Sequence, residues 1–515
     1  MRRASMWVGI VGLVGTLIAL SGCGSTVSAP SATSLTPAPK VGATDWLQFN
    51  GDSQHSGVNS QENQLTAQSV AGLHRQWSAK LPDAADSSPV FIGDVPLANG
   101  KHGAVIYVTT KMGALVALDA NSGSLLWSKQ PQGKNGTNSS PAVDPSKQFV
   151  YSYGIDGKVH KYAASDGTEV TTNGFPFTTS LMTDVEKGSS ALTIANDRIY
   201  ATMSGYFGDG GHYEGHVVSM LLSGGTPTIF NSLCSDHKDL LGPTKGQPNY
   251  CSDEKSGMWS RAGMVNDPAT GNIYAVTGNG PFSLTPASVG VTSWGNSIIA
   301  LSPDLSQVHD SYTPSNVTAL NDTDLDLGST APALLPMIPT SKTPLLLVQG
   351  GKDSTLRLIN RQNLSGQNGT GHLGGEVATI DTTGPLGKGL VFTQPVVWTD
   401  TGGTIWVYVT DEIPHTIGYT TGYQVQTDTN GNTTLHQAWK ITQRATSPIL
   451  AGGVLYIADG GKVLALDPQT GKTLWDSTQS SAGGTIGQIH WESPIVVNGH
   501  LYVTDEDGNI YSYSL

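Results

Sequence analysis

Charged residues are scarce in this 515-residue chain, and basic residues are the scarcer kind. Lys and Arg number 27 against 40 Asp and Glu, so the formal net charge is −13, and all charged residues together make up 13%. A general nucleic-acid binder needs a basic face that neutralises phosphates, and this charge balance argues against that class. Glycine is abundant instead, at 63 residues. Many glycines with few charges indicate many tight turns, which favours an all-β protein.

The N-terminus has the pattern of an export signal. Arg2 and Arg3 precede an apolar stretch at 6–20, which is shorter than a membrane-spanning helix and has the length of a signal peptide. The four residues that end at Cys23 resemble the lipobox of bacterial lipoproteins, in which this cysteine carries the lipid. The resemblance implies a signal peptide over 1–23, lipidation of Cys23 and an extracytoplasmic protein anchored to a bacterial membrane. An ordinary secretory signal with a chance cysteine is the alternative.

Residues 24–44 contain no aromatic side chain and little charge. A segment of this kind buries too little apolar surface to offset the entropy lost on ordering. We therefore expect a flexible tether between the anchor and the folded part of the chain.

Cysteine is nearly absent, since only Cys234 and Cys251 remain beyond Cys23. An exported protein can form disulfides, so we expect these two residues to be joined. The bond would close a short loop and stabilise it by roughly 3 kcal/mol. A zinc site is less favoured, because two cysteines without clustered histidines give poor ligand spacing.

The rest of the chain repeats a short pattern. The segments GALVALDANSGSLLW at 113–127 and GKVLALDPQTGKTLW at 461–475 share Ala-Leu-Asp, then a Gly four residues on, then a Trp four residues after that Gly. Alternating apolar residues predict strands, and the Asp and Gly between them predict a tight turn. Each copy is therefore expected to form a hairpin that ends in a large aromatic residue.

A second marker, a triad made mostly of small residues and ending in Pro or Ala, recurs eight times. The last residues of these triads are 46 to 71 residues apart, within the range of propeller repeats. They lie at 87–89, 139–141, 189–191, 260–262, 330–332, 393–395, 446–448 and 492–494. We therefore predict an eight-bladed β-propeller over 45–515, built from four-stranded antiparallel blades.

The eighth unit reaches Leu515 after only part of the repeat, so its outermost strand has to come from elsewhere. The segment 72–81 precedes the first triad and contains Trp77, a Trp of the kind that ends a unit. We expect this segment to close the ring. Trp77, Trp127, Trp439 and Trp475 are then expected to pack between neighbouring blades.

This repeat resembles that of pyrroloquinoline quinone (PQQ) dehydrogenases, and the resemblance covers most of 45–515. The same repeat also occurs in non-catalytic scaffolds, such as an outer-membrane assembly lipoprotein, so it implies the fold more strongly than the function. In the enzymes of this family, PQQ lies on the propeller axis between a Trp and a pair of adjacent, bonded cysteines. Calcium held by Glu, Asn and Asp polarises the quinone, an Asp acts as base, and a cation contacts the quinone oxygens.

The resemblance implies a role for several residues. The stretch 257–280 would place Trp259 under the quinone and Asn279 on the metal, and 350–361 would supply Lys352 as the cation that contacts the quinone. In 321–329 the register is open, so Asp324 and Asp326 are both candidates for the base, and Asp324 also for a metal ligand. Oxygen ligands suit calcium and a flat Trp suits a flat quinone.

Each of these residues also has an ordinary structural interpretation. Trp259 could pack within the propeller, Asn279 could hold a turn, Lys352 could be a solvated cation, and the two aspartates could belong to a polar loop. The chain has no adjacent cysteines and no haem motif, and neither Asp209 nor Glu214 falls cleanly on the position of the glutamate ligand. His212 and His216 are expected at the surface.

Two functions therefore follow from the sequence. The first is a lipid-anchored propeller with a degenerate cofactor site, which binds a partner protein or a small ligand in its axial funnel or acts as a scaffold. The alternative is a PQQ- and calcium-dependent dehydrogenase of alcohols or polymeric alcohols that passes electrons to an external acceptor.

Overall fold

The computed structural model describes residues 45–515 except 98–99, 243, 248, 285–291, 367–369, 383–389 and 414–416. The predicted signal peptide, the predicted tether and Cys23 lie outside the described residues. The chain divides into two compact units, Met1–Lys40 and Val41–Leu515, and the second contains all the described structure. Among the described residues, no helix combines the length and the apolar character that a membrane crossing requires.

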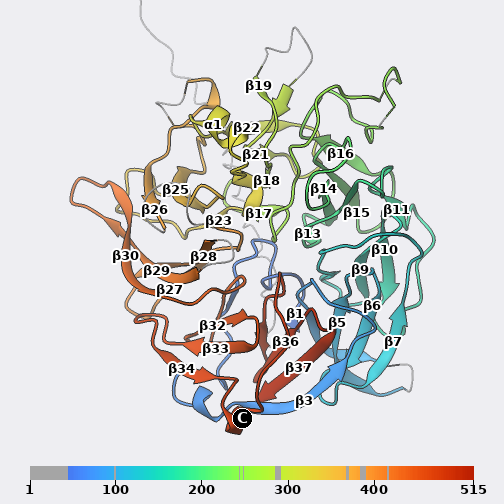
Figure 1. The fold of residues 1–515 in the computed structure, drawn as a ribbon, viewed down its shortest axis with the longest axis vertical. Helices are drawn as coiled ribbons and strands as arrows, with labels where there is room; N and C mark the ends of the chain where they lie inside the picture. Colours follow the sequence, from blue (N-terminus) through green and yellow to red (C-terminus); the bar gives the residue numbers. More distant parts are fainter. Residues whose placement is uncertain are drawn as a thin grey trace, which may run out of the picture. The chain divides into compact units, whose positions relative to one another are not determined.

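Eight antiparallel sheets follow one another around a ring, so the predicted eight-bladed propeller is confirmed (Figure 1). Blades 1 to 4 are formed by β4 (Val90–Pro96), β5 (His102–Thr109), β6 (Leu115–Asp119) and β7 (Leu125–Lys129); β8 (Ala142–Val143), β9 (Phe149–Gly154), β10 (Lys158–Ala163) and β11 (Phe177–Thr178); β12 (Glu186–Gly188) and β13 (Thr193–Ala195), β14 (Arg198–Gly205), β15 (His216–Leu221) and β16 (Thr228–Asn231); and β17 (Val265–Asp267), β18 (Asn272–Val276), β21 (Ile298–Leu301) and β22 (Val308–Tyr312). Blades 5 to 8 are formed by β23 (Ala333–Leu334), β24 (Leu346–Gln349), β25 (Thr355–Asn360) and β26 (Ala378–Asp381); β27 (Val396–Thr399), β28 (Ile405–Ile413), β29 (Ile417–Thr427) and β30 (Thr433–Ile441); β31 (Ile449–Ala451), β32 (Val454–Asp459), β33 (Lys462–Leu466) and β34 (Thr473–Asp476); and β35 (Ile495–Val497), β36 (His500–Thr504), β37 (Asn509–Ser514) and β3 (His74–Lys80).

A few short elements lie outside this pattern. β1 (Asp45–Trp46) pairs with β4, and β2 (Val58–Asn59) runs parallel to β31. β19 (Phe282–Leu284) and β20 (Thr292–Trp294) form a separate hairpin. The helical segments are α1 (Val317–Asp322), η1 (Val70–Gly72), η2 (Leu327–Ser329), η3 (Thr370–His372) and η4 (Ser480–Ala482).

The ring closes as the repeat predicts. β3, from the predicted segment 72–81, pairs antiparallel with β37 from the C-terminal end of the chain, and so supplies the fourth strand of blade 8. β1 and β2 add further N-terminal strands to blades 1 and 7. The N-terminal part of the propeller is thus joined to three blades, and β3 covers the edge of β37 that would otherwise be unpaired.

The eight triads mark the starts of the blades. In seven blades the first strand begins within three residues after the end of the triad, and in blade 3 the triad lies between β12 and β13. First strands such as β13, β17 and β23 lie toward the centre of the ring, while β7, β30 and β34 lie toward its rim (Figure 1). The residues just before each triad are therefore brought to the axis.

The apolar cores lie between neighbouring blades. Tyr107 of blade 1 shares a buried cluster with Val150 of blade 2, and Tyr408 of blade 6 shares one with Leu455 of blade 7. Both faces of these sheets are covered, which explains why the central strands are apolar along most of their length.

The repeat tryptophans join one blade to the next, as expected. Their indole Nε1 atoms donate to main-chain carbonyl oxygens of the following blade, from Trp77 to Ala120 at 3.2 Å, Trp127 to Ala164 at 3.3 Å, Trp439 to Pro468 at 2.8 Å and Trp475 to Leu73 at 2.9 Å. The last acceptor immediately precedes β3, so even the closing strand takes part in this contact.

Gly471 shows why the repeat has a glycine between its Asp and its Trp. This glycine has φ +71°, and a Cβ placed there would lie 2.6 Å from the ring of Trp439. Any side chain would have to displace the Trp of the preceding blade. The turn therefore requires glycine for two reasons, its left-handed backbone and the contact with Trp439.

We predict that Gly471→Ala destabilises the propeller by about 1–3 kcal/mol more than Gly453→Ala does. Gly453 has nearly the same φ, +73°, but nothing lies within 4 Å of its Cβ position, so it serves as a control for backbone strain alone. Urea unfolding of the two variants measures the difference. Equal losses would show that the contact with Trp439 contributes nothing.

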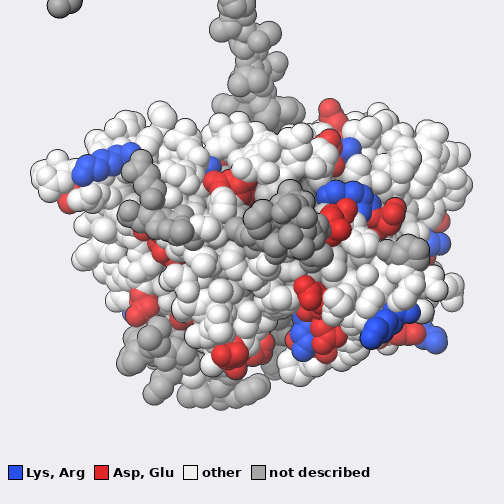
Figure 2. Space-filling view, turned by 90° about the horizontal axis from the view of Figure 1, so that it is seen from above, with Lys and Arg blue, Asp and Glu red and all other residues white. Residues whose placement is uncertain are grey.

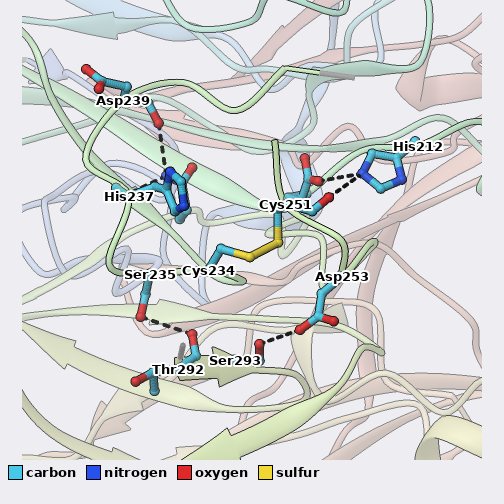
Figure 3. Close-up of a disulfide and its surroundings, with 11 residues drawn as sticks. His212, Cys234, Ser235, His237, Asp239, Cys251, Asp253, Thr292 and Ser293 are labelled. Carbon is cyan, nitrogen blue, oxygen red and sulfur yellow. Dashed lines mark hydrogen bonds and ion pairs between the residues drawn. A yellow bond between two sulfur atoms is a disulfide. The ribbon is translucent and has the colours of Figure 1, made fainter. Parts of the chain in front are cut away.

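The predicted disulfide between Cys234 and Cys251 is present, and Figure 3 shows its surroundings. Both cysteines are buried against Leu233 and Leu241 in the connection between β16 and β17. The segment it closes is held further by Ser235, whose hydroxyl donates to the carbonyl oxygen of Thr292 at 3.0 Å. The disulfide thus fixes a loop that lies against the hairpin β19–β20.

We predict that replacing both cysteines by serine lowers the free energy of unfolding by about 3 kcal/mol, because the closed loop spans 17 residues. Thermal unfolding with and without a thiol reductant measures the effect. The reductant should lower the stability of the wild type and leave the double variant unchanged. A wild-type protein that is insensitive to reduction during unfolding would contradict the prediction.

Candidate functional site

A single large cavity lies where the segments before the first strands meet. Its volume is about 1680 Å³, and residues from all eight blades line it. They include Asp86, Asn138, Lys187, Trp259, Asp326, Phe392, Ser447 and Trp491. In contrast, the face of the molecule seen in Figure 2 carries few charged residues, with basic and acidic ones interspersed.

All five residues singled out for the cofactor site line this one cavity: Trp259, Asn279, Asp324, Asp326 and Lys352. They come from the start of blade 4, from the end of β18, from the segment after α1, and from the turn between β24 and β25. The fold therefore collects residues that are up to 93 positions apart in the chain. Their individual roles stay predictions.

Lys352 and Asp326 form an ion pair in the cavity wall. The Lys352 Nζ atom lies 2.5 Å from Asp326 Oδ2, 3.4 Å from Asp324 Oδ2 and 5.2 Å from the centre of the Trp259 ring. Burial raises the pKa of Asp326, and the nearby ammonium group opposes that rise. Burial also acts to lower the pKa of Lys352, but the two carboxylates outweigh it and raise that pKa. Lys352 therefore carries a positive charge, and the two carboxylates beside it already balance that charge.

Asn279 connects the two aspartates. Its backbone N–H donates to Asp326 Oδ1 at 2.6 Å and its side-chain Nδ2 donates to Asp324 Oδ1 at 2.8 Å. The Asn279 Oδ1 atom accepts a hydrogen bond from Asn296 Nδ2 at 2.7 Å. Gly278 allows the close approach, since a Cβ there would lie 2.5 Å from Asp326 Oδ1. Asn279 thus holds the turn, as its structural interpretation suggests, and also presents its amide to the cavity.

The two aspartates differ in exposure. The side chain of Asp324 is 75% exposed and that of Asp326 is 10% exposed. Asp324 also has a left-handed backbone, with φ +55°, which is uncommon for a residue other than glycine. This conformation turns one carboxylate toward solvent and leaves the other in the wall, so the pair offers two different environments.

An aromatic layer crosses the cavity between blades 4, 6 and 8. The ring centres of Trp259 and Phe392 lie 6.1 Å apart, and those of Phe392 and Trp491 lie 5.9 Å apart. The sequence reasoning did not find Phe392 or Trp491. A signal was available, because each of these three residues stands directly before the triad of its blade.

Arg261, at the start of blade 4, ties this blade to four others at the axis. Its guanidinium donates to the carbonyl oxygens of Asp86 at 3.0 Å, Asn138 at 3.2 Å and Ser189 at 3.2 Å, in blades 1, 2 and 3. Its Cζ atom also lies 5.3 Å from the ring centre of Trp491 in blade 8. This residue, too, was missed, because its partners lie 72 to 230 positions away in the chain.

A second charged cluster faces the cavity. Asp86, His490 and Glu506 form the only group of three or more metal-ligating side chains among the described residues. Lys111 Nζ lies 3.2 Å from both carboxylates. Burial acts to raise the pKa of Asp86, but His490 and Lys111 outweigh it and hold that pKa below its usual range. The ammonium group of Lys111 thus offsets part of the negative charge of these two carboxylates.

The two candidates for the glutamate ligand separate in space. Asp209 lines the cavity and accepts a hydrogen bond from the Tyr213 hydroxyl at 2.6 Å. Glu214 is not among the lining residues; it is 1% exposed and lies 2.8 Å from His212 Nε2. His216 was expected at the surface, and this is wrong: it is buried in β15, where its ring nitrogens face two main-chain carbonyl oxygens.

We predict that Glu214→Gln makes the protein less sensitive to rising pH. Burial and the nearby Glu186 raise the pKa of Glu214 to about 7, against the opposing effect of His212. The folded state therefore holds a proton that the unfolded chain releases, and this contribution to stability is lost as the pH rises toward and through 7. The amide cannot ionise, so the variant should gain up to about 3 kcal/mol relative to wild type between pH 5 and pH 8.

Urea unfolding at the two pH values tests this, with Glu254→Gln as the matched control. Glu254 is the other carboxylate partner of His212, at 3.2 Å, but it is half exposed. Its replacement should change the pH dependence little. If the two variants behave alike, the burial of Glu214 does not control the effect.

Two protein families match parts of the chain. The family described as "Glucose/ethanol/alcohol dehydrogenase, beta-propeller domain" matches residues 46–152, and "Outer membrane protein assembly factor BamB" matches residues 397–515. A search of curated protein sequences gave no match.

Solved structures show the same fold. A quinohemoprotein alcohol dehydrogenase from Pseudomonas putida HK5 aligns with a TM-score of 0.64 and 16% identity, over 92% of this chain and 80% of that one. A europium-containing methanol dehydrogenase aligns with a TM-score of 0.64 and 15% identity, over 92% of this chain and 98% of that one. A quinohemoprotein alcohol dehydrogenase from Comamonas testosteroni aligns with a TM-score of 0.61 and 15% identity, over 92% of this chain and 80% of that one. The chain is thus similar to the first family over residues 46–152 and to the second over residues 397–515, and it shares the propeller fold of these solved dehydrogenases.

Proposed function

We propose that the chain is a PQQ- and calcium-dependent oxidoreductase that acts on alcohols and passes electrons to an external acceptor. One observation carries the proposal: Trp259, Asn279, Asp324, Asp326 and Lys352 line the same axial cavity. Had they only structural roles in separate blades, nothing would require them to meet at one place.

The residues present fit the two groups chemically. Trp259 offers a flat aromatic face next to a cation, which suits a planar quinone. Asn279 and Asp324 bring an amide and a carboxylate together at the open side of the cavity, and such oxygen ligands suit calcium. When bound, the quinone would supply the acceptor for the two electrons that leave the alcohol.

The side chains of the protein would do the remaining work. Asp326 would accept the proton of the substrate hydroxyl, because it is a carboxylate in a water-poor wall, where it is a stronger base than in solvent. Lys352 would hold Asp326 in place through its ion pair. The layer of Trp259, Phe392 and Trp491 would keep water from the floor of the cavity.

A second candidate function is ligand binding or scaffolding without catalysis. The match of residues 397–515 to the BamB family favours it, as does the lack of adjacent cysteines that could close the quinone site. In this case the cavity would receive a segment of a partner protein or a small molecule.

We further propose that the protein works outside the cytoplasm, anchored through lipid on Cys23. The disulfide between Cys234 and Cys251 supports an oxidising compartment. The apolar stretch that ends at Cys23 supports the anchor.

A titration of the full-length protein with PQQ, with and without calcium, separates the two functions. We expect saturable binding that requires calcium, quenches Trp fluorescence and raises the melting temperature. Lys352→Ala and Asn279→Ala should weaken binding by at least tenfold, because each removes a polar group that faces the ligand.

Lys342→Ala is the control, since Lys342 is an exposed loop residue away from the cavity and should bind PQQ like the wild type. If PQQ does not bind at high micromolar concentration, the oxidoreductase proposal is overturned and the second candidate function, ligand binding or scaffolding, is favoured.

A further inference from the structure

Lys187 is a cation without an acidic partner in the cavity wall. It lies in β12, its Nζ atom donates to Asn138 Oδ1, and it lies 5.4 Å from the ring centre of Tyr206. Within the part of the chain that the structure describes, it forms no ion pair. Burial lowers the pKa of Lys187 to about 8. An ammonium group in this position is costly unless an anion joins it.

The carboxylate that acts electrostatically on Lys187, Asp86, already has other partners. Asp86 accepts a hydrogen bond from Asn138 Nδ2 at 2.6 Å and pairs with Lys111 at 3.2 Å. His490 Nδ1 lies 3.2 Å from its other oxygen. Asp86 therefore has no free oxygen to offer to Lys187.

Arg261 adds a second buried cation to the same wall. Its guanidinium contacts carbonyl oxygens and no carboxylate, and its Nε atom has no hydrogen-bond partner among the described residues. Burial lowers the pKa of Arg261 to about 10, still well above neutrality. Both cations line the cavity.

The local charges leave an excess of positive charge. Lys111, Lys187 and Arg261 bring three basic side chains to this wall, against the two carboxylates of Asp86 and Glu506. Glu492 lies close by, but burial raises its pKa well above the usual range, which favours its neutral form. One further negative charge would balance this wall.

We propose that Lys187 and Arg261 form a subsite that binds a carboxylate of a planar aromatic ligand. The inference rests on the proposed function and adds the orientation of the ligand to it. The carboxylate edge would meet Lys187 and Arg261, and the opposite edge would meet Asn279, Asp324 and Lys352. The ring of Trp491, stacked near Arg261, gives the flat ligand a face to lie on.

Binding of PQQ and of its trimethyl ester to full-length protein tests this subsite. The wild type should bind the acid at least tenfold more tightly than the ester. Lys187→Met, of similar volume but uncharged, should lose roughly tenfold to a hundredfold in affinity for the acid and keep its affinity for the ester. Lys134→Met, at an exposed lysine, is the matched control and should bind the acid like the wild type.

The pH dependence gives a second readout. Lys187 faces Asp86, Lys111, Arg261 and Tyr206. Because its ammonium group is lost near pH 8 in the free protein, wild-type affinity for the acid should fall as the pH rises from 7 to 9. In Lys187→Met this fall should be absent. A parallel fall in the variant would overturn the assignment to Lys187.

The unliganded protein gives a third readout, which also shows that the variant folds. Removing an unpaired buried cation should raise the melting temperature of free Lys187→Met above that of the wild type. A clear decrease would show that Lys187 is stabilised within the protein itself, and would count against a subsite.

A smaller probe, quinoline-2-carboxylate with its methyl ester, separates this inference from the proposed function. If the carboxylate binds in a Lys187-dependent way and PQQ does not, the subsite stands and the oxidoreductase fails. If PQQ binds wild type and Lys187→Met equally well, the subsite fails and the oxidoreductase stands. If the wild type binds neither acid, both fail.

Discussion

The pairing of β3 with β37 is the constraint on which the rest of the structure depends. It joins residues 74–80 to residues 509–514, so nearly the whole propeller is enclosed between two paired strands. The same join gives Trp475 its acceptor at Leu73, and so extends the contact between blades across the closure. Without this pairing, the edge of β37 would be unpaired and the contact between Trp475 and Leu73 would be lost. The cavity needs all eight blades, and so it needs the closure.

Closure explains why one position in the repeat supplies so much of the site. The residue before each triad comes to the axis, and Asp86, Asn138, Trp259, Phe392 and Trp491 all occupy that position. In an open array these residues would lie on separate repeats. In the closed ring Trp259 and Trp491 both contact Phe392 across the axis. One position of the repeat therefore supplies much of the cavity lining, while Asn279, Asp324, Asp326 and Lys352 come from connections between strands.

The repeat predicted the blades, the closing strand and the roles of Trp77, Trp127, Trp439 and Trp475, because these follow from local periodicity. The resemblance to a family pointed to Trp259, Asn279 and Lys352, and the fold brings them together, although their roles stay predictions. The sequence alone could not predict the environment of each side chain in the cavity and around it. Burial of His216, the exposure difference between Asp324 and Asp326, and the partners of Arg261 all depend on contacts between distant blades.

Lys187 and Lys352, two of the lysines that line the cavity, show why environment matters more than residue type. The motif identified Lys352, but two aspartates balance its positive charge. Lys352 therefore adds little net attraction for an anion. Lys187 belongs to no motif, and its hydrogen-bond partner among the described residues is the amide oxygen of Asn138. A ligand that carries negative charge gains most where the protein has left a positive charge unmatched. A ligand anion therefore gains more beside Lys187 and Arg261 than beside Lys352, the cation that the motif identified.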